Sequence, residues 1–292
     1  MPELPEVEST VRYLKERVEG LSIERAVILW HRTIALNRGK SFSQQVAGAT
    51  ITEVFRRGKL VGMRLAGASD QFLFTHLRMS GSLDVLPSSF DVAPHDRVII
   101  FLSNGKSIRF NDTRKFGRMY LTPSPDEVVR SLGVEPLSAE FTPELLQRLL
   151  AGRKRAIKPA LLDQSLIAGL GNIYVDESLW RSGIHPLSPC SSLPEDAWRS
   201  LRRSIQEILS EAVSLLGTDF GDGVVDGGMY RPSVYGRTGE RCPRCSGEIS
   251  RIVVGQRGTH LCLSCQPKPR KARHRVKLTR GAKAPSQKRR KR

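Results

Sequence analysis

The chain contains 292 residues and carries a formal net charge of +18, with 39% hydrophobic and 26% charged residues. A chain of this length can form more than one domain and bury a sizeable core. No apolar run is long enough to cross a bilayer, and the first residues lack the basic and apolar regions of a signal peptide. We therefore expect an intracellular, cytoplasmic protein rather than a membrane or secreted one, with nucleic acid as the favoured partner of the positive charge.

The first predicted element is a helix over residues 5–18. Pro5 suits a first helical turn, Glu6 suits the positive end of the helix dipole, and apolar residues follow at helical spacing. This pattern leaves the residues before it, Met1, Pro2 and Glu3, without a structural explanation.

Pro2 and Glu3 could form a catalytic pair. Removal of Met1 would give Pro2 a free secondary amine, and because an α-amino group titrates at about 7.7–8.0, a usable fraction is unprotonated at neutral pH. Such an amine can attack the aldehyde carbon of a sugar, and Glu3 could move protons to and from the sugar oxygen and the base. Because proline is common at position two, the residues alone leave an ordinary chain start as the alternative.

Short segments rich in β-branched and aromatic residues follow, with Gly, Ser, Asn and Asp between them. Many short strands at this spacing predict a sandwich or a flattened barrel. The pattern changes near residues 123–136, after which a helix begins near Thr142 and further helices are predicted over 173–181 and 194–216. The predicted strands are residues 23–30, 51–55, 60–65, 71–76, 97–102, 107–110 and 119–122.

A glycine pair lies between two helical patterns, in the stretch Gly169-Leu170-Gly171-Asn172. Glycines there permit a sharp turn and let a nucleic acid backbone approach the exposed amides of the next helix. An ordinary connection between helices is the alternative, which the spacing alone favours. The basic composition and the metal module described next favour a contact with DNA phosphate.

Four of the five cysteines form two C-x2-C pairs, Cys242 with Cys245 and Cys262 with Cys265, separated by sixteen residues. Each pair brings two thiolates onto one side of a tight turn, so together they predict one tetrahedral, structural Zn²⁺ site. Two disulfides are the alternative, which a reducing compartment disfavours. The alternating residues 249–261 between the pairs predict a β-hairpin.

Residues 267–292 form a basic tail. Between Lys268 and Arg292, 13 of the 47 Lys and Arg residues occur without any Asp or Glu, so the rest of the chain holds 34 basic and 29 acidic residues. A segment with so few apolar residues is predicted to be disordered and to attract polyanions. It can add sequence-independent affinity for DNA through counterion release.

Several motifs together resemble the formamidopyrimidine-DNA glycosylase family over essentially residues 1–266. They are PELPEVE at the start, THLRMSG at 75–81, NDTRKFG at 111–117, GLGNIYVDESL at 169–179, and VYGRTGERCPRC with QRGTHLCLSCQ within 234–266. The resemblance implies an α+β multidomain fold: an N-terminal helix on a two-sheet β-sandwich, a helix–two-turns–helix domain and a C-terminal zinc-ribbon β-hairpin. We expect these parts at 1–136, 137–235 and 236–266, followed by the tail, in a monomer that binds double-stranded DNA containing damaged bases.

The resemblance also implies a bifunctional DNA repair enzyme. It would excise oxidised purines such as 8-oxoguanine and formamidopyrimidines, and then nick the DNA at the abasic site by β,δ-elimination. In the family's pattern Pro2 is the Schiff-base nucleophile and Glu3 the general acid, while Glu6 matches a carboxylate near the site. Lys59 matches the proton donor of β-elimination, and Arg257 matches the zinc-finger arginine that grips phosphate and is linked to δ-elimination. Taken alone, Lys59 would be a solvated strand lysine, Arg257 a surface residue, and Glu6 a partner of the helix dipole.

The same resemblance implies the DNA contacts. Met79, Arg114 and Phe116 would fill the gap left by an extruded nucleotide, because an enzyme that attacks a base's sugar must turn that nucleotide out of the stack. By pattern alone Met79 and Phe116 would be core residues. The expected phosphate contacts are His95, Arg153, Lys158 and Asn172.

Two rival functions stay open. The sister glycosylase for oxidised pyrimidines tends to have glycine where Leu4 stands, which favours the purine enzyme. A zinc-ribbon DNA-binding protein without catalysis would need none of Pro2, Glu3 and Lys59. The segment 217–230, which corresponds to the loop that senses the everted base, is glycine-rich and acidic, so the lesion preference is open. The intact four-cysteine module favours a bacterial source over a plastid-bearing eukaryote. For a DNA repair enzyme we expect a cytoplasmic, nucleoid-associated location.

Overall fold

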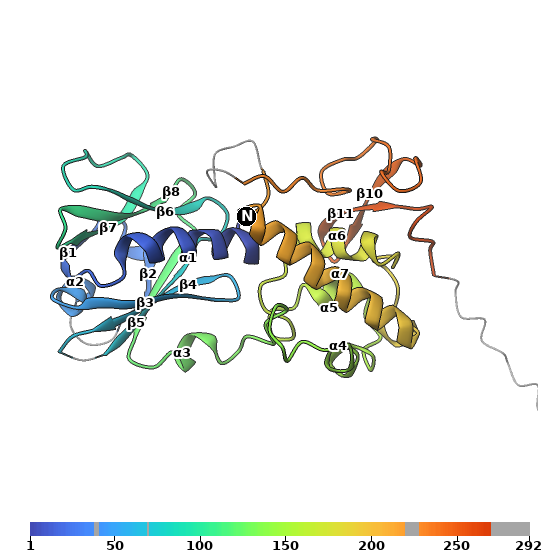
Figure 1. Ribbon diagram of the computed structural model, residues 1–292, viewed down its shortest axis with the longest axis horizontal. Coiled ribbons are helices and arrows are strands. Elements are labelled where there is room, and N and C mark those ends of the chain that lie inside the picture. Colours follow the sequence, from blue (N-terminus) through green and yellow to red (C-terminus); the bar gives the residue numbers. More distant parts are fainter. Residues whose placement is uncertain (38–40, 69, 220–227, 270–292) are drawn as a thin grey trace, which may run out of the picture.

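The computed structural model describes residues 1–37, 41–68, 70–219 and 228–269 of the chain. Figure 1 shows a β-rich body and a helical body side by side, with helix α1 (Leu4–Val18) running along the first toward the second. None of the helices in these ranges is long and apolar enough to cross a membrane.

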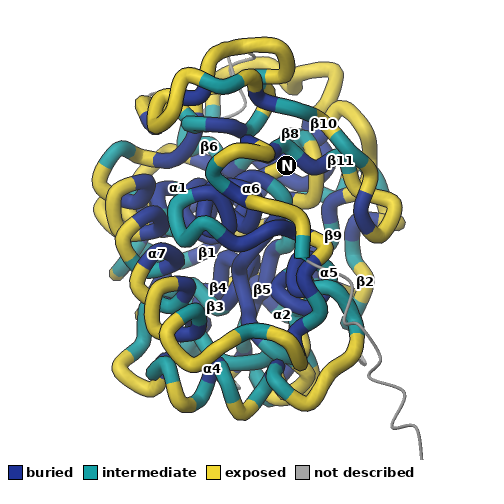
Figure 2. Tube along the Cα trace, turned by 90° about the vertical axis from the view of Figure 1, so that its right-hand side faces the viewer, coloured by how far each residue is buried: buried dark blue, intermediate teal, exposed yellow. Residues whose placement is uncertain are grey.

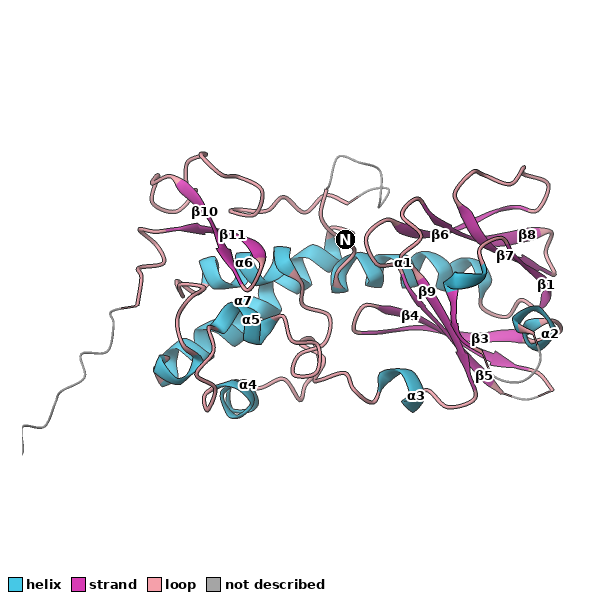
Figure 3. Cartoon of the chain, turned by 180° about the vertical axis from the view of Figure 1, so that it is seen from behind, coloured by secondary structure: helices cyan, strands magenta, loops and turns pink. Residues whose placement is uncertain are grey.

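The β-rich body is a sandwich of two sheets (Figure 3). One is a four-stranded sheet of order β1-β7-β8-β6, and the other is a five-stranded sheet of order β2-β9-β5-β4-β3. Neighbouring strands are antiparallel except for β2 and β9, and the apolar residues between the sheets form the first hydrophobic core. The strands are β1 (Ile23–Ile28), β2 (Ile34–Leu36), β3 (Thr50–Arg57), β4 (Leu60–Ala66), β5 (Gln71–His76), β6 (Gly81–Pro87), β7 (Asp96–Leu102), β8 (Lys106–Asp112) and β9 (Arg118–Thr122).

Helix α1 belongs to both bodies. Val7, Val11 and Leu14 pack into the sandwich core, whereas Leu4 packs into the core of the helical body. The Leu4 N–H donates to the carbonyl of Gly169 at 3.1 Å, and a Cβ on Gly169 (φ +88°) would lie 2.8 Å from the Leu4 side chain. This close approach requires glycine and fixes the start of the chain at the junction of the two bodies.

The helical body is built around α6 and α7, with Tyr174 and Trp198 fully buried between its helices. Figure 2 shows buried segments in the interior and exposed loops at the periphery. The fifth cysteine, Cys190, is buried in this core. The helices of the chain after α1 are α2 (Phe42–Val46), α3 (Asp126–Val129), α4 (Pro143–Leu150), α5 (Ile157–Leu161), α6 (Asn172–Arg181) and α7 (Glu195–Ser214), with short 3₁₀ turns at His31–Thr33 and Cys190–Ser192.

The cysteine-rich module is a hairpin of β10 (Ile249–Val254) and β11 (Arg257–Cys262), which lies beside α6 (Figure 1). The turn between its strands is Gly255-Gln256, and both residues have positive φ. Trp180 of α6 packs against the module, and its indole N–H donates to Cys242 Sγ at 3.4 Å. The hairpin is therefore attached to the helical body through one face of α6.

The predicted fold class is confirmed, and the predicted elements lie close to the observed ones. Strands β2 and β6 and helices α2, α3 and α5 were not predicted from the sequence. Strand β6 reads GSLDVLP, in which Gly, Ser, Asp and Pro are typical of turns, yet it pairs with β8 from Gly81 opposite Asp112 to Pro87 opposite Lys106. Because β6 is an edge strand, it tolerates these residues.

Candidate active site

A cavity of about 420 Å³ opens at the junction of the two bodies. The turn between β3 and β4 contributes Lys59 to its wall, the start of α6 contributes Gly171 and Asn172, and the start of β11 contributes Arg257. Met1 also lines it. The fold thus brings these three distant parts of the sequence together beside the start of the chain.

Glu3 is fully buried against the N-terminal end of α6. Its carboxylate accepts hydrogen bonds from the Ile173 N–H at 3.0 Å and from the Tyr174 N–H at 3.4 Å. A Cβ on Gly171 would overlap this carboxyl group, so the helix must begin with glycine for Glu3 to reach its amides. The positive end of the helix dipole faces the carboxylate.

Burial raises the pKa of Glu3 to about 7, and the charge of Glu6 adds to the rise, while Lys59 and the helix amides oppose it. A carboxyl group with this pKa can give up or take a proton at neutral pH. This suits a general acid or base.

The wall of the cavity is cationic. Lys59 is buried, whereas Arg78 and Arg257 are exposed. Burial lowers the pKa of Lys59 and Arg257 acts in the same direction, although Glu3 and Glu6 counteract both. The Lys59 ammonium therefore gives up its proton more readily than a solvated lysine does.

His76 adds a neutral group to this wall. Burial, Arg78 and Lys59 lower the pKa of His76 to about 3, and its Nδ1 accepts a hydrogen bond from the Arg78 N–H at 3.0 Å. The imidazole is therefore neutral, and its proton is assigned to Nε2. This leaves Nε2–H as an uncharged hydrogen-bond donor.

Pro2 is buried. In the chain it lies between Met1, which lines the cavity, and Glu3. It also lines a second cavity of about 420 Å³, together with Leu77 and Leu216. While Met1 is attached, the Pro2 nitrogen is part of a peptide bond. The predicted amine therefore requires the removal of Met1.

Glu6 ties the start of the chain to two other segments. Its Oε2 accepts a hydrogen bond from the Glu3 N–H at 2.8 Å, while its Oε1 accepts from the Tyr174 hydroxyl at 2.5 Å and from the Thr218 N–H at 2.8 Å. A Cβ on Gly217 would lie 2.8 Å from Glu6 Oε1. Glu6 therefore does more than complement the helix dipole, because it joins α1 to α6 and to the chain after α7.

Met79, Arg114 and Phe116 lie on two turns, one between β5 and β6 and one between β8 and β9. Met79 is 42% exposed and Phe116 is 47% exposed. The Arg114 guanidinium lies 5.0 Å from the centre of the Phe116 ring. The alternative that Met79 and Phe116 are core residues is therefore wrong.

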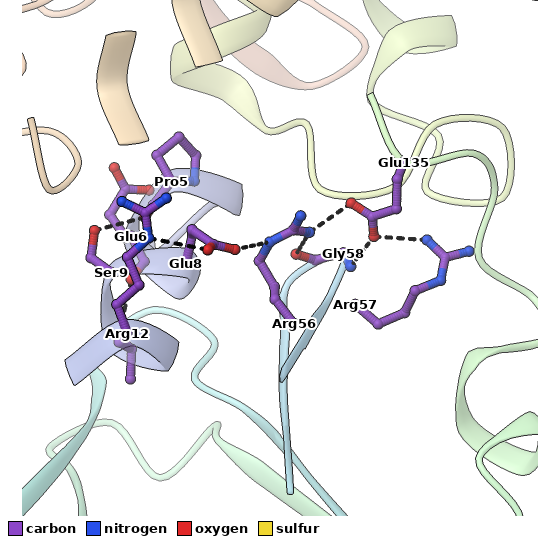
Figure 4. Close-up of polar contacts among 10 residues, drawn as sticks. Pro5, Glu6, Glu8, Ser9, Arg12, Arg56, Arg57, Gly58 and Glu135 are labelled. Atoms are coloured by element: carbon purple, nitrogen blue, oxygen red, sulfur yellow. Dashed lines mark hydrogen bonds and ion pairs between the residues drawn. The ribbon is translucent and has the colours of Figure 1, made fainter. Parts of the chain in front are cut away.

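An ion-pair network holds the turn between β3 and β4 (Figure 4). Arg56 contacts Glu8 of α1 at 2.9 Å and Glu135 at 2.7 Å, and Arg57 contacts Glu135 at 2.8 Å. The Gly58 N–H donates to Glu135 at 2.6 Å. Although burial opposes it, Arg56, this N–H and Arg57 lower the pKa of Glu135. The network links α1, the turn and the connection to the helical body.

Lys158 and Asn172 hold the hairpin of the cysteine-rich module. Both donate to the carbonyl of Gly258, Asn172 at 2.9 Å and Lys158 at 3.1 Å. The Lys158 ammonium also forms an ion pair with Asp176 at 2.6 Å, and the Lys158 side chain is 0% exposed. In this structure the ammonium is enclosed by protein, which differs from the expected direct contact with phosphate.

The other expected phosphate-binding residues, His95 and Arg153, are exposed and do not line the cavity. One guanidinium nitrogen of Arg97 lies 3.3 Å from His95 Nδ1, and Arg153 Nε donates to the carbonyl of Leu149 at 3.0 Å. Their roles toward DNA stay predictions.

The four cysteines of the C-x2-C pairs form one cluster, whose sulfur atoms all lie within 4.8 Å of one another. The closest pairs join different knuckles: Cys245 with Cys262 at 3.4 Å and Cys242 with Cys265 at 3.8 Å. This arrangement fits tetrahedral coordination of one Zn²⁺ by four thiolates. Since four protein ligands complete the coordination sphere, the metal is structural.

Comparisons with known proteins agree with this arrangement. The model of the formamidopyrimidine-DNA glycosylase N-terminal domain matches residues 1–119, and the model of the H2TH domain of the same glycosylase matches residues 132–221. A model of the zinc finger found in FPG and IleRS matches residues 239–268. The chain belongs to the formamidopyrimidine-DNA glycosylase family.

Curated family members are similar over nearly their whole length. The formamidopyrimidine-DNA glycosylase of Protochlamydia amoebophila is 41% identical, and the alignment covers 92% of this chain and 100% of that protein. The Brevibacillus brevis glycosylase is 42% identical, with 91% and 99% covered. Both relatives are bacterial.

Solved structures of the family share the fold. Wild-type Lactococcus lactis Fpg (MutM) bound to DNA containing N7-benzyl-Fapy-dG has a TM-score of 0.85 and 36% identity, covering 91% of this chain and 100% of that one. MutM in complex with DNA containing carbocyclic 8-oxo-G has a TM-score of 0.84 and 37% identity, with the same coverage. The predicted family, fold and zinc module are thereby confirmed.

Three residues of the site were not predicted from the sequence: His76, Asp176 and Glu177. Glu177 accepts hydrogen bonds from the N–H groups of Val234 and Tyr235 at 2.8 and 2.9 Å, which anchors the connection to the zinc module. The available signal was a pair of adjacent acidic residues inside an otherwise apolar helix. Residues 220–227 of the loop expected to sense the base, and residues 270–292 of the tail, lie outside the described residues.

Proposed function

We propose that the chain is a bifunctional DNA repair enzyme that excises oxidised purines from double-stranded DNA and then cleaves the abasic site. The observation that carries this proposal is Glu3, a fully buried carboxyl group with a pKa of about 7, adjacent in the chain to Pro2 and at the start of α6. The relatives bound to N7-benzyl-Fapy-dG and carbocyclic 8-oxo-G DNA support purine lesions as substrates.

In the first step the Pro2 amine, freed by removal of Met1, attacks C1′ of the damaged nucleotide. The N–C1′ bond forms, the glycosidic bond breaks, and the base leaves with the bonding electron pair and the proton of the amine. Glu3 then donates a proton to the ring oxygen O4′, the C1′–O4′ bond opens, and the nitrogen lone pair forms a cationic iminium.

The iminium draws electrons during the strand cleavage that follows. Loss of the C2′ proton and breakage of the C3′–O bond release one phosphate by β-elimination, and loss of the C4′ proton with breakage of the C5′–O bond releases the other by δ-elimination. Lys59 supplies the proton in the first elimination, which its lowered pKa supports. Arg257 grips the phosphate of the second, since its planar guanidinium matches phosphate geometry.

Met79, Arg114 and Phe116 fill the space of the everted nucleotide, which their exposure supports. Asn172, His95 and Arg153 contact phosphates. Lys158 acts as a positioning residue that holds the Arg257 turn through the Gly258 carbonyl. We also propose a monomer with the division into parts at 1–136, 137–235 and 236–266.

A second candidate substrate class is oxidised pyrimidines, because Lactococcus lactis Fpg has been solved with DNA containing an oxidised pyrimidine. Release of 8-oxoguanine and of thymine glycol from matched duplexes separates the two classes. The proposal predicts faster release of 8-oxoguanine. Faster release of thymine glycol would favour the pyrimidine enzyme.

A non-catalytic DNA-binding protein is tested by Pro2→Gly. The proposal predicts that this variant loses cleavage of abasic DNA far more than DNA affinity, because glycine offers no secondary amine. Equal losses of cleavage and affinity would instead indicate misfolding. Undiminished cleavage would contradict the assignment of Pro2.

A further inference from the structure

Met79, Arg114 and Phe116 lie on two turns, and the apolar side chains of Met79 and Phe116 are exposed, although Leu77 at the start of the first turn is buried in the sandwich core. Arg78 and Lys115, which directly precede Met79 and Phe116, have positive φ angles of 60° and 61°. Residues other than glycine disfavour this left-handed conformation, and it persists only where surrounding structure holds it. Both turns therefore need an anchor.

Asp112, the last residue of β8, supplies that anchor. Its Oδ1 accepts hydrogen bonds from the Ser80 hydroxyl at 2.5 Å and from the Arg114 N–H at 3.2 Å, and its Oδ2 accepts from the Gly117 N–H at 2.7 Å. Ser80 belongs to the first turn, whereas Arg114 and Gly117 belong to the second. The Arg114 N–H also donates to the Ser80 hydroxyl at 3.2 Å, so the turns are joined directly.

The backbone of Asp112 extends this link to a third segment. Its N–H donates to the carbonyl of His95 at 2.9 Å, and its carbonyl accepts from Arg97 Nε at 2.8 Å. Asp112 is only 1% exposed. One buried residue thus connects three segments for which DNA contacts are proposed.

Both oxygens of the Asp112 carboxylate accept hydrogen bonds, and each accepts them from different donors. An asparagine at position 112 would keep one acceptor oxygen and replace the other with an amide group that cannot accept. Either the Gly117 N–H would then face an amide group that cannot accept, or the Arg114 N–H would keep only the Ser80 hydroxyl as its acceptor. The geometry of at least one turn therefore depends on the second oxygen.

We infer that Asp112 is a positioning residue for base eversion. It holds the Met79 turn and the Phe116 turn together in the geometry that fills the space of the everted nucleotide. The inference rests on the proposed role of Met79, Arg114 and Phe116 in the duplex.

The Asp112→Asn variant of the full zinc-loaded chain tests this inference. A duplex with 8-oxoguanine and a neighbouring 2-aminopurine reports the unstacking of the lesion by stopped-flow fluorescence. We expect the fluorescence change and base excision to slow by about tenfold or more, because eversion must precede excision. Strand cleavage at a preformed abasic site, which has no base to unstack, should change by less than about threefold.

Asp163→Asn is the matched control. It removes a carboxylate that also organises a turn, through the N–H and hydroxyl of Ser165 at 3.1 and 2.6 Å, but in the helical body. It should leave both reactions unchanged, and thermal unfolding checks that both variants fold. Equal losses of Asp112→Asn on both substrates, or no loss on either, would overturn the inference.

Met79→Ala and Phe116→Ala separate this inference from the proposed function. If these variants leave the fluorescence change intact, the proposed role of the two side chains is wrong and the inference falls with it. If they slow the change while Asp112→Asn does not, only the inference fails.

Discussion

The pKa of Glu3 is set by opposing effects of its surroundings. Burial and the Glu6 charge raise its pKa, Lys59 and the amides of α6 lower it, and the outcome is about 7. At this pKa both protonation states are populated at neutral pH. A carboxyl group with this pKa can give up a proton without leaving its position, as the proposed role of Glu3 requires.

The Glu3 shift also predicts how stability depends on pH. The folded protein binds the Glu3 proton more tightly than an unfolded chain with a pKa of 4.5, so the stabilisation is complete below pH 4.5 and is lost as pH rises through about 7. The Glu3→Gln variant has no carboxyl group at this position, so its stability does not fall in this way as pH rises. Between pH 4.5 and 8 the free energy of unfolding of the variant should gain roughly 3 kcal/mol relative to the wild type. Urea unfolding at both pH values measures this, and a difference that stays constant would contradict it.

At the scale of single residues the sequence indicated candidates for the site but not the surroundings of their side chains. Pro2, Glu3 and Lys59 could be singled out because their chemistry or their motif is distinctive. The exposure of Met79 and Phe116 could not be predicted, because the sequence pattern does not distinguish an apolar residue in a turn from an apolar residue in a core. Lys158 shows the reverse case, because a lysine expected on the surface is enclosed by Asp176 and the hairpin.

Helix α6 is the element that assembles the site. Its first amides bind Glu3, Asp176 holds Lys158, and Glu177 holds the connection to the zinc module. The sequence predicted this helix from its periodicity and its glycine start. It could not predict the partners of the two acidic residues, because those partners lie far along the chain and only the tertiary fold brings them close.

Gly171→Ala tests the start of α6. The added Cβ would overlap the Glu3 carboxyl group, so Glu3 must move away from the helix amides. We expect base excision to fall by about tenfold or more, whereas DNA affinity should change much less. Gly152→Ala, which adds a Cβ with no heavy atom within 4 Å, is the control and should behave as wild type. If both variants excise bases equally well, the assigned position of Glu3 is wrong.

The turn between β3 and β4 depends on Glu135. Glu135→Gln would leave Arg56, which is 11% exposed, without one of its two carboxylate partners. Because the variant replaces the carboxylate shared by Arg56 and Arg57 with a neutral amide, the free energy of unfolding should fall by about 2 kcal/mol. Abasic-site cleavage should fall more than base excision, since Lys59 is in this turn. Glu140→Gln, at an exposed position nearby, should change the stability by less than about 0.5 kcal/mol.

The whole molecule is organised by α1, whose two ends pack into different hydrophobic cores. This explains why the opening residues are fixed in place although chain ends usually fray. The division into a sandwich, a helical body and a zinc module could be predicted from changes of periodicity and from the cysteine spacing. The cavity between these parts could not be predicted from the sequence, because it forms only when the parts pack together.

The basic tail of residues 267–292 is expected to strengthen the binding of the full chain to DNA. Deleting residues 268–292 removes 13 positive side chains and no negative ones. The slope of log affinity for undamaged duplex against log salt concentration should become shallower, because fewer counterions are released. An unchanged slope would show that the tail does not contact DNA.

Trapping of the covalent intermediate tests the central claim most directly. Abasic-site DNA is mixed with the purified chain, the iminium is reduced with borohydride, and the adduct is mapped by mass spectrometry. The account predicts one adduct, on the nitrogen of Pro2 in a chain that has lost Met1. An adduct on Lys59, or strand cleavage without loss in chains that retain Met1, would contradict it.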